Sequence, residues 1–315
     1  MNILVAGGAG FIGSNLAGAL LGAGHRVVCV DDLSLGREEN LARHRSNDRF
    51  KFIQLDLLDQ SRLDALFAAE RPECVFHLAA NSNIQAGAGD RTIDLHRTFL
   101  TTFSLLQCMK NHGVGQIVFA SSSAIYGERA GALREDAGPL FPISCYGAAK
   151  LASEAYLSAF AHGGAMRAWI IRFPNVVGAP ATHGVIFDFI NKLRANSREL
   201  EILGDGMQEK PYLFVCDLIA AMLFAWEHAR ETVNCFNVAG EGTTTVRRIA
   251  EIVVEEMELK DVAFKTTGGK RGWPGDVPKF EYDTSKIEAL GWRASRNSEE
   301  SVRAAVRAIL GKGAV

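Results

Sequence analysis

Short apolar runs alternate with helical patterns through the first half of the chain. The runs span about five residues and are apolar on both faces, which is typical of strands buried inside a parallel sheet. They lie at residues 2–6, 26–30, 50–54, 73–77, 115–120 and 167–171. The helical patterns lie between them, near residues 12–22, 60–69, 92–112 and 146–162. This β-α-β alternation predicts a doubly wound α/β sheet.

The pattern changes after residue 172, where glycine and proline become frequent and the apolar runs are scattered, as at 211–215 and 234–238. We therefore expect two domains, 1–172 and 173–315, with some segments interleaved, the second being smaller and mixed. Its helices are expected at 184–195, 216–229, 245–257 and 298–310. Ser298 is the expected N-cap of the last helix, because acidic residues follow it in the first turn.

Composition narrows the class of protein. The 315 residues are 48% apolar and 22% charged, which is typical of a globular chain rather than a disordered one. The net charge of −2 gives no basic excess for nucleic-acid binding. No apolar stretch is long enough to cross a bilayer, and the N-terminus lacks the basic region of a signal peptide. We therefore expect no nucleic-acid or membrane partner and a cytoplasmic location.

The six cysteines give no sign of a metal site in the sequence. They contain no Cys-x-x-Cys pair and do not group with histidines at the usual zinc spacing. Free thiols and no bound metal are the expectation.

A glycine-rich loop follows the first predicted strand and opens the first predicted helix. Gly7, Gly10 and Gly13 allow a tight turn and let backbone amides approach a pyrophosphate at the helix N-terminus. Asp31 ends the second strand, where a carboxylate can bind the ribose hydroxyls and would repel a 2′-phosphate, so NAD is favoured over NADP. Asp56, after the third strand, either borders the adenine or caps a helix.

Polar side chains also follow the fifth predicted strand. Ser121, Ser122 and Ser123 lie at its carboxyl end, the edge at which open α/β sheets bind ligands. Tyr146 and Lys150 come about twenty residues later, and their i, i+4 spacing puts them on one helical face. We expect the ammonium to lower the pKa of the tyrosine, which could then serve as a general base.

The joint pattern resembles the extended short-chain dehydrogenase/reductase family, in its nucleotide-sugar epimerase and dehydratase branch. The resemblance extends over nearly the whole chain. It rests on residues 7–13, 77–80, 121–127, 146–150, 172–178, 204–210, 275–277 and 290–292. It implies a Rossmann domain that binds NAD, a C-terminal domain that binds a nucleoside diphosphate sugar, and a homodimer that pairs through the helices near 92–112 and 146–162.

The resemblance also implies roles for individual residues. Tyr146 would be the base, Lys150 would contact the cofactor ribose and tune the tyrosine, and Ser122 would orient the substrate hydroxyl. The implied NAD-binding residues are Gly7, Gly10, Phe11, Ile12, Gly13, Asp31, Asp56, Leu57, Ala79, Ala80, Tyr146 and Lys150. The implied substrate-binding residues are Ser82, Ser122, Ser123, Tyr146, Asn175, Lys210 and Arg271.

Two positions discriminate between the reactions of this family. Its 4,6-dehydratases carry an Asp-Glu pair directly after the catalytic hydroxyl residue, whereas this chain has Ser123 and Ala124. The pattern therefore favours an NAD-dependent 4-epimerase acting on a UDP-hexose or UDP-hexuronic acid. A nucleotide-sugar reductase, an epimerase acting at another carbon, and a non-catalytic NAD-sensing protein remain as alternatives. Lys210 and Trp273 stand where arginines are usual, which leaves the base and the sugar open.

Overall fold

The computed structural model describes residues 1–313 apart from 165, 182 and 270–276, and it divides into two compact units. The first unit comprises residues 1–127, 138–172 and 222–236. The second comprises residues 128–137, 173–221 and those from 237 onward. Each unit has its own hydrophobic core. No helix among the described residues is long and apolar enough to span a bilayer.

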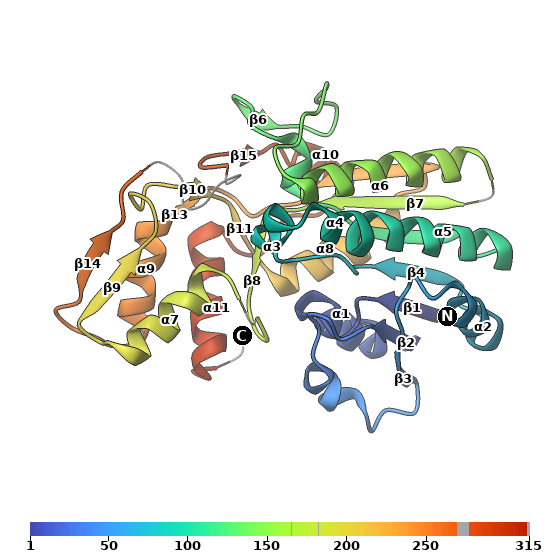
Figure 1. Cartoon of the computed structure of the whole chain (residues 1–315), viewed down its shortest axis with the longest axis horizontal. Coiled ribbons are helices and arrows are strands. Elements are labelled where there is room, and N and C mark those ends of the chain that lie inside the picture. Colours follow the sequence, from blue (N-terminus) through green and yellow to red (C-terminus); the bar gives the residue numbers. More distant parts are fainter. Residues whose placement is uncertain (165, 182, 270–276, 314–315) are drawn as a thin grey trace. The chain divides into compact units, whose positions relative to one another are not determined.

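The first unit is built on a seven-stranded sheet with the order β12-β7-β5-β4-β1-β2-β3 (Figure 1). Its strands are β1 (Asn2–Ala6), β2 (Arg26–Asp31), β3 (Phe50–Gln54), β4 (Cys74–His77), β5 (Gln116–Ala120), β7 (Arg167–Arg172) and β12 (Val233–Asn237). The first six pair in parallel, with Leu4 opposite Val28. The expected doubly wound α/β fold is thus confirmed. The seventh strand comes from a part of the sequence that was expected to belong to the second domain.

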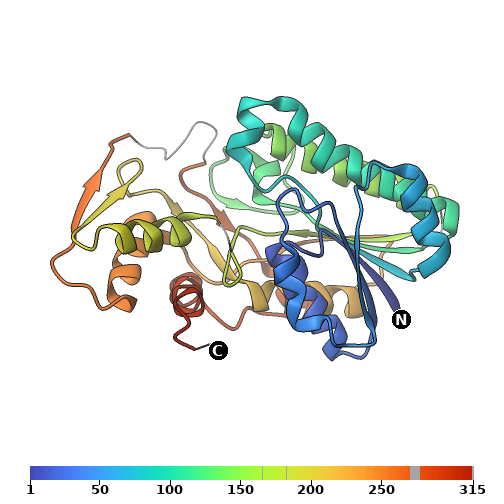
Figure 2. The ribbon, with the colours of Figure 1, turned by 60° about the horizontal axis from the view of Figure 1, so that its bottom comes forward.

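Helices cover both faces of this sheet. They are α1 (Phe11–Gly22), α2 (Gln60–Glu70), α5 (Thr101–His112), α6 (Cys145–His162) and the 3₁₀ helix η1 (Glu38–His44). On one face α2 packs against α5 and α5 against α6, while α1 lies on the opposite face (Figure 2). The core consists of strand side chains such as Val28 and Phe119 together with helix residues such as Leu105.

The helix predicted at 92–112 is confirmed, since residues 91–112 are helical throughout, but part of it departs from α-helical geometry. The structure has α3 (Ile84–Gly89), α4 (Arg91–Asp94) and a π-helical turn, η2 (Leu95–Leu100), before α5 begins. The Thr101 hydroxyl donates to the Arg97 carbonyl and the Thr102 hydroxyl donates to the Thr98 carbonyl. Such bonds from threonine to the preceding turn accompany bends in helices, which is the physical reason we assign to the change of geometry.

The second unit is a mixed assembly of short strand pairs and helices. Its strands are β6 (Ala132–Leu133), β8 (Asn175–Val177), β9 (Glu199–Ile202), β10 (Glu209–Lys210), β11 (Tyr212–Phe214), β13 (Thr244–Thr245), β14 (Ala263–Thr266) and β15 (Glu281–Tyr282). Its helices are α7 (Val185–Ala195), α9 (Val246–Glu256), α10 (Ser285–Leu290) and α11 (Ser298–Leu310), and α8 (Val215–His228) begins in it. The apolar faces of α7, α9 and α11 pack together around Phe189, Ile249 and Val302.

The start of α11 differs from the prediction by one residue. Asn297, not Ser298, is the N-cap: its side chain accepts from the Glu300 amide, and its own amide donates to the Glu300 carboxylate, both at 2.9 Å. The Ser298 hydroxyl is buried instead and accepts from the Tyr212 amide at 3.1 Å, so it is not available for capping.

Replacing Asn297 with alanine is expected to lower the free energy of unfolding by about 1 kcal/mol, because the side chain that accepts from the Glu300 amide is lost, whereas the backbone amide that donates to the Glu300 carboxylate is kept. Urea denaturation of the two proteins measures this difference. Asn297→Gly is the matched control and should cost only a few tenths of that amount, since glycine is itself an acceptable N-cap. An alanine variant as stable as the parent would contradict the capping assignment.

Candidate active site

The glycine loop between β1 and α1 packs too closely on its surroundings to admit side chains. Gly7 has φ +81°, and a Cβ placed on it would lie 2.6 Å from the Ala79 amide nitrogen. A Cβ on Gly13 would lie 2.1 Å from the Gly7 carbonyl oxygen. The amides of Gly7 and Gly8 both donate to the Val30 carbonyl. The loop is therefore held against the carboxyl ends of β2 and β4.

The first turn of α1 is suited to an anionic ligand. Gly10 is the N-cap and offers no side-chain acceptor, and the first turn contains no acidic residue. The first-turn amides of Phe11, Ile12 and Gly13 have no partner within the helix, as in any helix. Backbone donors at a positive helix end fit the pyrophosphate of a dinucleotide, so the residues present here fit NAD.

Asp31 lies at the end of β2, directly beside this loop. One carboxylate oxygen accepts from the Ala9 amide at 3.0 Å and the other from the Leu33 amide at 2.9 Å. Burial raises the pKa of Asp31, and the two amide hydrogen bonds oppose that shift. Each carboxylate oxygen has a second lone pair, so the group can hold the loop in place and still accept from a ribose hydroxyl.

The other predicted cofactor residues lie at the carboxyl ends of β3 and β4. Asp56 accepts from the Leu58 amide in the turn after β3, whereas the N-cap of α2 is Asp59. Leu57 packs into the core, and its carbonyl accepts from the Ser104 hydroxyl at 2.7 Å. Ala79 and Ala80 follow β4 and are partly buried.

Ser122, Tyr146 and Lys150 come together at the carboxyl end of β5. Ser122 is the N-cap of a 3₁₀ turn at Ser123–Tyr126, and its hydroxyl is hydrogen-bonded to Tyr146. The Lys150 ammonium nitrogen donates to the Ala120 carbonyl at 2.6 Å and lies 5.9 Å from the centre of the Tyr146 ring. The i, i+4 spacing on α6 thus places both side chains at one strand end, as expected.

Gly147 explains how α6 can approach this strand end so closely. A Cβ on Gly147 would lie 2.4 Å from the Ala124 carbonyl oxygen and 3.0 Å from the Pro142 side chain. The first turn of α6 therefore packs directly on the 3₁₀ turn that Ser122 caps. Glycine at this position is what allows the Tyr146 ring to reach the Ser122 hydroxyl.

The expectation that the Lys150 ammonium lowers the pKa of Tyr146 is wrong for the protein without its cofactor. Burial raises the pKa of Tyr146 to about 12; the Ser122 hydrogen bond opposes this shift and the charge of Asp94 adds to it. Burial also lowers the pKa of Lys150 to about 7, against the effect of Glu154. The ammonium is bonded to a backbone carbonyl rather than to the phenol, so desolvation outweighs its attraction for the phenolate.

A buried ion pair that the sequence analysis missed supports the same strand end. Glu154, one turn beyond Lys150 on α6, binds Arg172 of β7 through two hydrogen bonds of 2.7 and 3.0 Å. The Glu154 carboxylate also accepts from the Ser121 hydroxyl, and Arg172 donates to the Tyr126 hydroxyl at 2.9 Å. The pair therefore holds both ends of the segment that carries Ser122. The Tyr-x-x-x-Lys-x-x-x-Glu spacing was the one available signal for it.

Asp94 is a second buried group that the sequence did not reveal. One of its carboxylate oxygens accepts from the Asn81 side chain at 2.9 Å. The other is buried without a hydrogen-bond partner among the described residues. Burial raises the pKa of Asp94. Its charge acts on Tyr146, which places an acid near the phenol that no motif had indicated.

The predicted substrate residues are divided between the two units. Ser82 is exposed after β4, and Ser123 opens the 3₁₀ turn after β5. Asn175 is the exposed first residue of β8, and Lys210 ends β10, both in the second unit. Arg271 lies outside the described residues, as does Trp273.

Replacing Lys150 with methionine is expected to change how stability depends on pH. A lysine whose pKa is near 7 when folded, against its ordinary value of 10.5 when unfolded, binds fewer protons in the folded state. The parent therefore gains stability as pH rises from about 7 to 10.5. The variant lacks this gain. The free energy of unfolding of the variant minus that of the parent should therefore be roughly 1–3 kcal/mol higher at pH 6 than at pH 9.

Urea denaturation of nucleotide-free protein at the two pH values measures this effect, and comparing them cancels the pH-independent cost of the lost Ala120 hydrogen bond. The exposed Lys110→Met is the matched control and should show no such difference. Equal stability differences at both pH values would disprove the lowered pKa.

The fold and the site together define a class of protein. A doubly wound sheet, a glycine loop after its first strand and a Ser-Tyr-Lys group at its fifth strand make this an extended short-chain dehydrogenase/reductase. Residues 3–239 match the NAD dependent epimerase/dehydratase family, and the chain belongs to that family.

Three relatives illustrate the similarity. The UDP-glucose 4-epimerase of Mycolicibacterium smegmatis is 36% identical over 299 residues, covering 93% of each chain. The UDP-glucose 4-epimerase of Thermotoga maritima, solved with UDP-glucose, is 32% identical with a TM-score of 0.87 and 99% of each chain covered. The UDP-glucuronic acid 4-epimerase of Bacillus cereus, solved with NAD and a fluorinated UDP-sugar, is 25% identical with a TM-score of 0.89, covering 99% of this chain and 100% of that one.

Proposed function

We propose that this protein is an NAD-dependent 4-epimerase that acts on a UDP-linked hexose or hexuronic acid. The observation that carries the proposal is the composition of the segment after β5. Ser122 faces Tyr146, and the next two residues are Ser123 and Ala124. Loss of water from the sugar needs an acid to protonate the leaving hydroxyl, and neither of these side chains can supply it. The segment after β5 therefore favours oxidation and re-reduction at one carbon over loss of water.

Tyr146 is the proton carrier in this proposal. As the phenolate, its oxygen takes the proton of the sugar hydroxyl that is being oxidised, and the resulting phenol returns that proton when the other epimer forms. Ser122 is hydrogen-bonded to Tyr146 and would hold the sugar hydroxyl in line with it. When bound, NAD supplies a hydride acceptor and donor. Lys150 would contact the cofactor ribose, and its ammonium would then favour the phenolate form of Tyr146.

We assign the NAD contacts to the glycine loop, Asp31, the segments after β3 and β4, and Lys150. The first unit, with residues 1–172 as its main part, is the proposed nucleotide-binding domain. Residues 173–315 supply the proposed nucleotide-sugar domain, with Asn175, Lys210 and Arg271 as its substrate contacts.

Incubation of the purified protein with UDP-glucose, UDP-galactose and UDP-glucuronic acid, without added NAD, tests the reaction. Proton NMR should reveal inversion at C4 and no loss of mass. A 4-keto-6-deoxy product would make the protein a dehydratase, and inversion at another carbon would move the site of oxidation. Net reduction that depends on added NADH would make it a reductase. Bound NAD without turnover of any sugar would favour a sensing role.

We also propose a homodimer that pairs through η2, α5 and α6. Phe99 and Phe103 pack edge-to-face on Tyr156, at ring-centre distances of 5.1 and 5.7 Å, and Tyr156 remains 41% exposed. Partly exposed aromatic side chains are typical anchors of protein interfaces. Light scattering should give twice the chain mass, and Tyr156→Arg should give the chain mass. A parent protein that is monomeric at working concentration would refute the dimer.

The cytoplasm is the proposed compartment. All six cysteines are free thiols. A reducing environment keeps cysteines in this state.

A further inference from the structure

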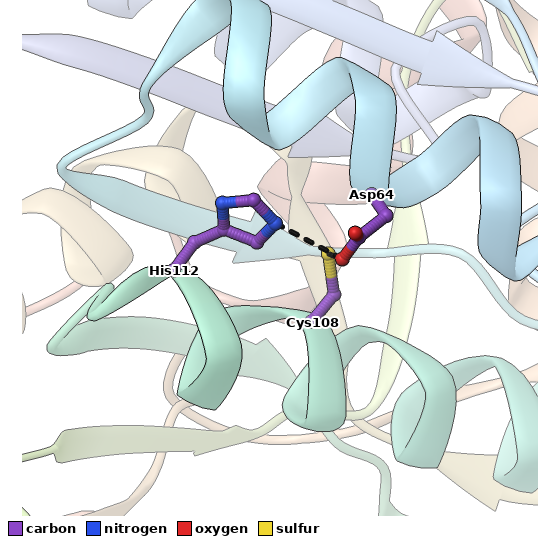
Figure 3. A group of neighbouring side chains, drawn as sticks. All are labelled: Asp64, Cys108 and His112. Atoms are coloured by element: carbon purple, nitrogen blue, oxygen red, sulfur yellow. Dashed lines mark hydrogen bonds and ion pairs between the residues drawn. The ribbon is translucent and has the colours of Figure 1, made fainter.

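A group of three potential metal ligands lies on the first unit, where helices α2 and α5 pack together. Asp64 comes from α2, and Cys108 and His112 come from successive turns of α5 (Figure 3). None of the three belongs to the proposed catalytic, cofactor or substrate residues. The sequence analysis missed the group because its third member lies on another helix, more than forty residues away from the Cys-x-x-x-His pair.

The distances between the ligand atoms suit a small cation. Asp64 Oδ1 lies 3.0 Å from His112 Nε2 and 3.8 Å from Cys108 Sγ. The three ligand atoms all lie within 4.8 Å of one another. Around a tetrahedral zinc ion, N, O and S ligands are separated by roughly 3.2–3.6 Å, as follows from the usual bond lengths. Small rotations of the His112 ring and of the exposed Asp64 side chain would be needed to bring the three atoms to these separations.

We propose that Asp64, Cys108 and His112 form a three-ligand site for a zinc-like divalent cation, with water as the fourth ligand. Thiolate and imidazole favour zinc and its neighbours among the transition metals over magnesium or calcium, which prefer oxygen ligands. On binding, the Cys108 thiol releases its proton to solvent. The thiolate and the carboxylate then balance the two positive charges of the ion.

The surroundings distinguish this group from an ordinary surface ion pair. Cys108 is fully buried, whereas the side chains of His112 and Asp64 are 24% and 52% exposed, so an ion can enter from the solvent side. The His112 ring packs on Phe67 of α2 at a ring-centre distance of 5.7 Å, which restricts its orientation. A bound cation would hold Cys108 as the thiolate, because a coordinating thiol is deprotonated.

Titration of the full-length, reduced, tag-free protein with Co²⁺ tests the proposal. One equivalent should produce a thiolate-to-cobalt charge-transfer band and tetrahedral d–d bands, and Zn²⁺ should displace the Co²⁺. Because the site ties α2 to α5, saturating Zn²⁺ should also raise the Tm. These readouts do not depend on turnover of any sugar, so their result is independent of the proposed 4-epimerase activity.

Cys108→Ser should abolish the charge-transfer band, and Asp64→Asn should weaken Co²⁺ binding by at least 10–100-fold, roughly the loss seen even for outer-shell partners. Asp64 is half exposed, so its substitution should leave the fold intact. An unchanged Tm of the metal-free variant checks this. Cys216→Ser, which removes an exposed thiol elsewhere, is the matched control and should bind like the parent. Absence of the charge-transfer band in the parent, or the same affinity in Asp64→Asn, would overturn the proposal.

Discussion

Replacing Tyr146 with phenylalanine is expected to lower kcat by roughly 10²–10⁴-fold, the usual scale for loss of a general acid–base group. The phenol is hydrogen-bonded to Ser122, at the strand end where the proposed chemistry takes place. The substitution removes one oxygen atom and leaves the ring in place, so the fold and NAD retention should be preserved. Steady-state kinetics with the preferred UDP-sugar, together with the absorbance of bound cofactor, measures both properties.

Tyr156→Phe is the matched control for this prediction. It makes the same chemical change on the same helix, at a residue that is 41% exposed and lies away from Ser122. Its kcat should stay near that of the parent. If Tyr146→Phe turned over at a near-normal rate, another group would be the base, and Asp94 would be the first to examine because its charge already acts on this tyrosine.

Replacing Glu154 with glutamine is expected to lower the free energy of unfolding by roughly 3–5 kcal/mol, because it leaves the buried Arg172 charge without its partner. Glu154 and Arg172 are 6% and 7% exposed and are joined by two hydrogen bonds. Activity should fall as well, since the same pair holds Ser121 and Tyr126 on either side of Ser122. Denaturant unfolding and kinetics on the same preparations measure both effects.

An exposed ion pair provides the control for this second prediction. Glu201 and Lys192 lie 3.6 Å apart with side chains 56% and 30% exposed, so Glu201→Gln should change stability by no more than about 1 kcal/mol. The double variant Glu154→Gln with Arg172→Met removes both charges and should recover part of the loss. A Glu154→Gln protein as stable as the parent would show that the pair does not support the strand end.

The sequence by itself determined the features that depend on neighbouring residues. Six strands of the first sheet, the glycine loop and the spacing of Tyr146 and Lys150 could all be recognised, because hydrophobic period, backbone freedom and helical spacing are local properties. The same patterns supported the family and its NAD dependence, both of which are confirmed.

Only the tertiary structure decided the features that depend on distant segments. It placed β12 in the first sheet, paired Glu154 with Arg172, and brought Asp64 to Cys108 and His112. It also reversed the expected pKa shift of Tyr146, since burial and the direction of the Lys150 side chain, which i, i+4 spacing does not report, outweigh charge proximity. Pairing, desolvation and ligand distance arise when segments far apart in the chain pack together, so no local pattern encodes them.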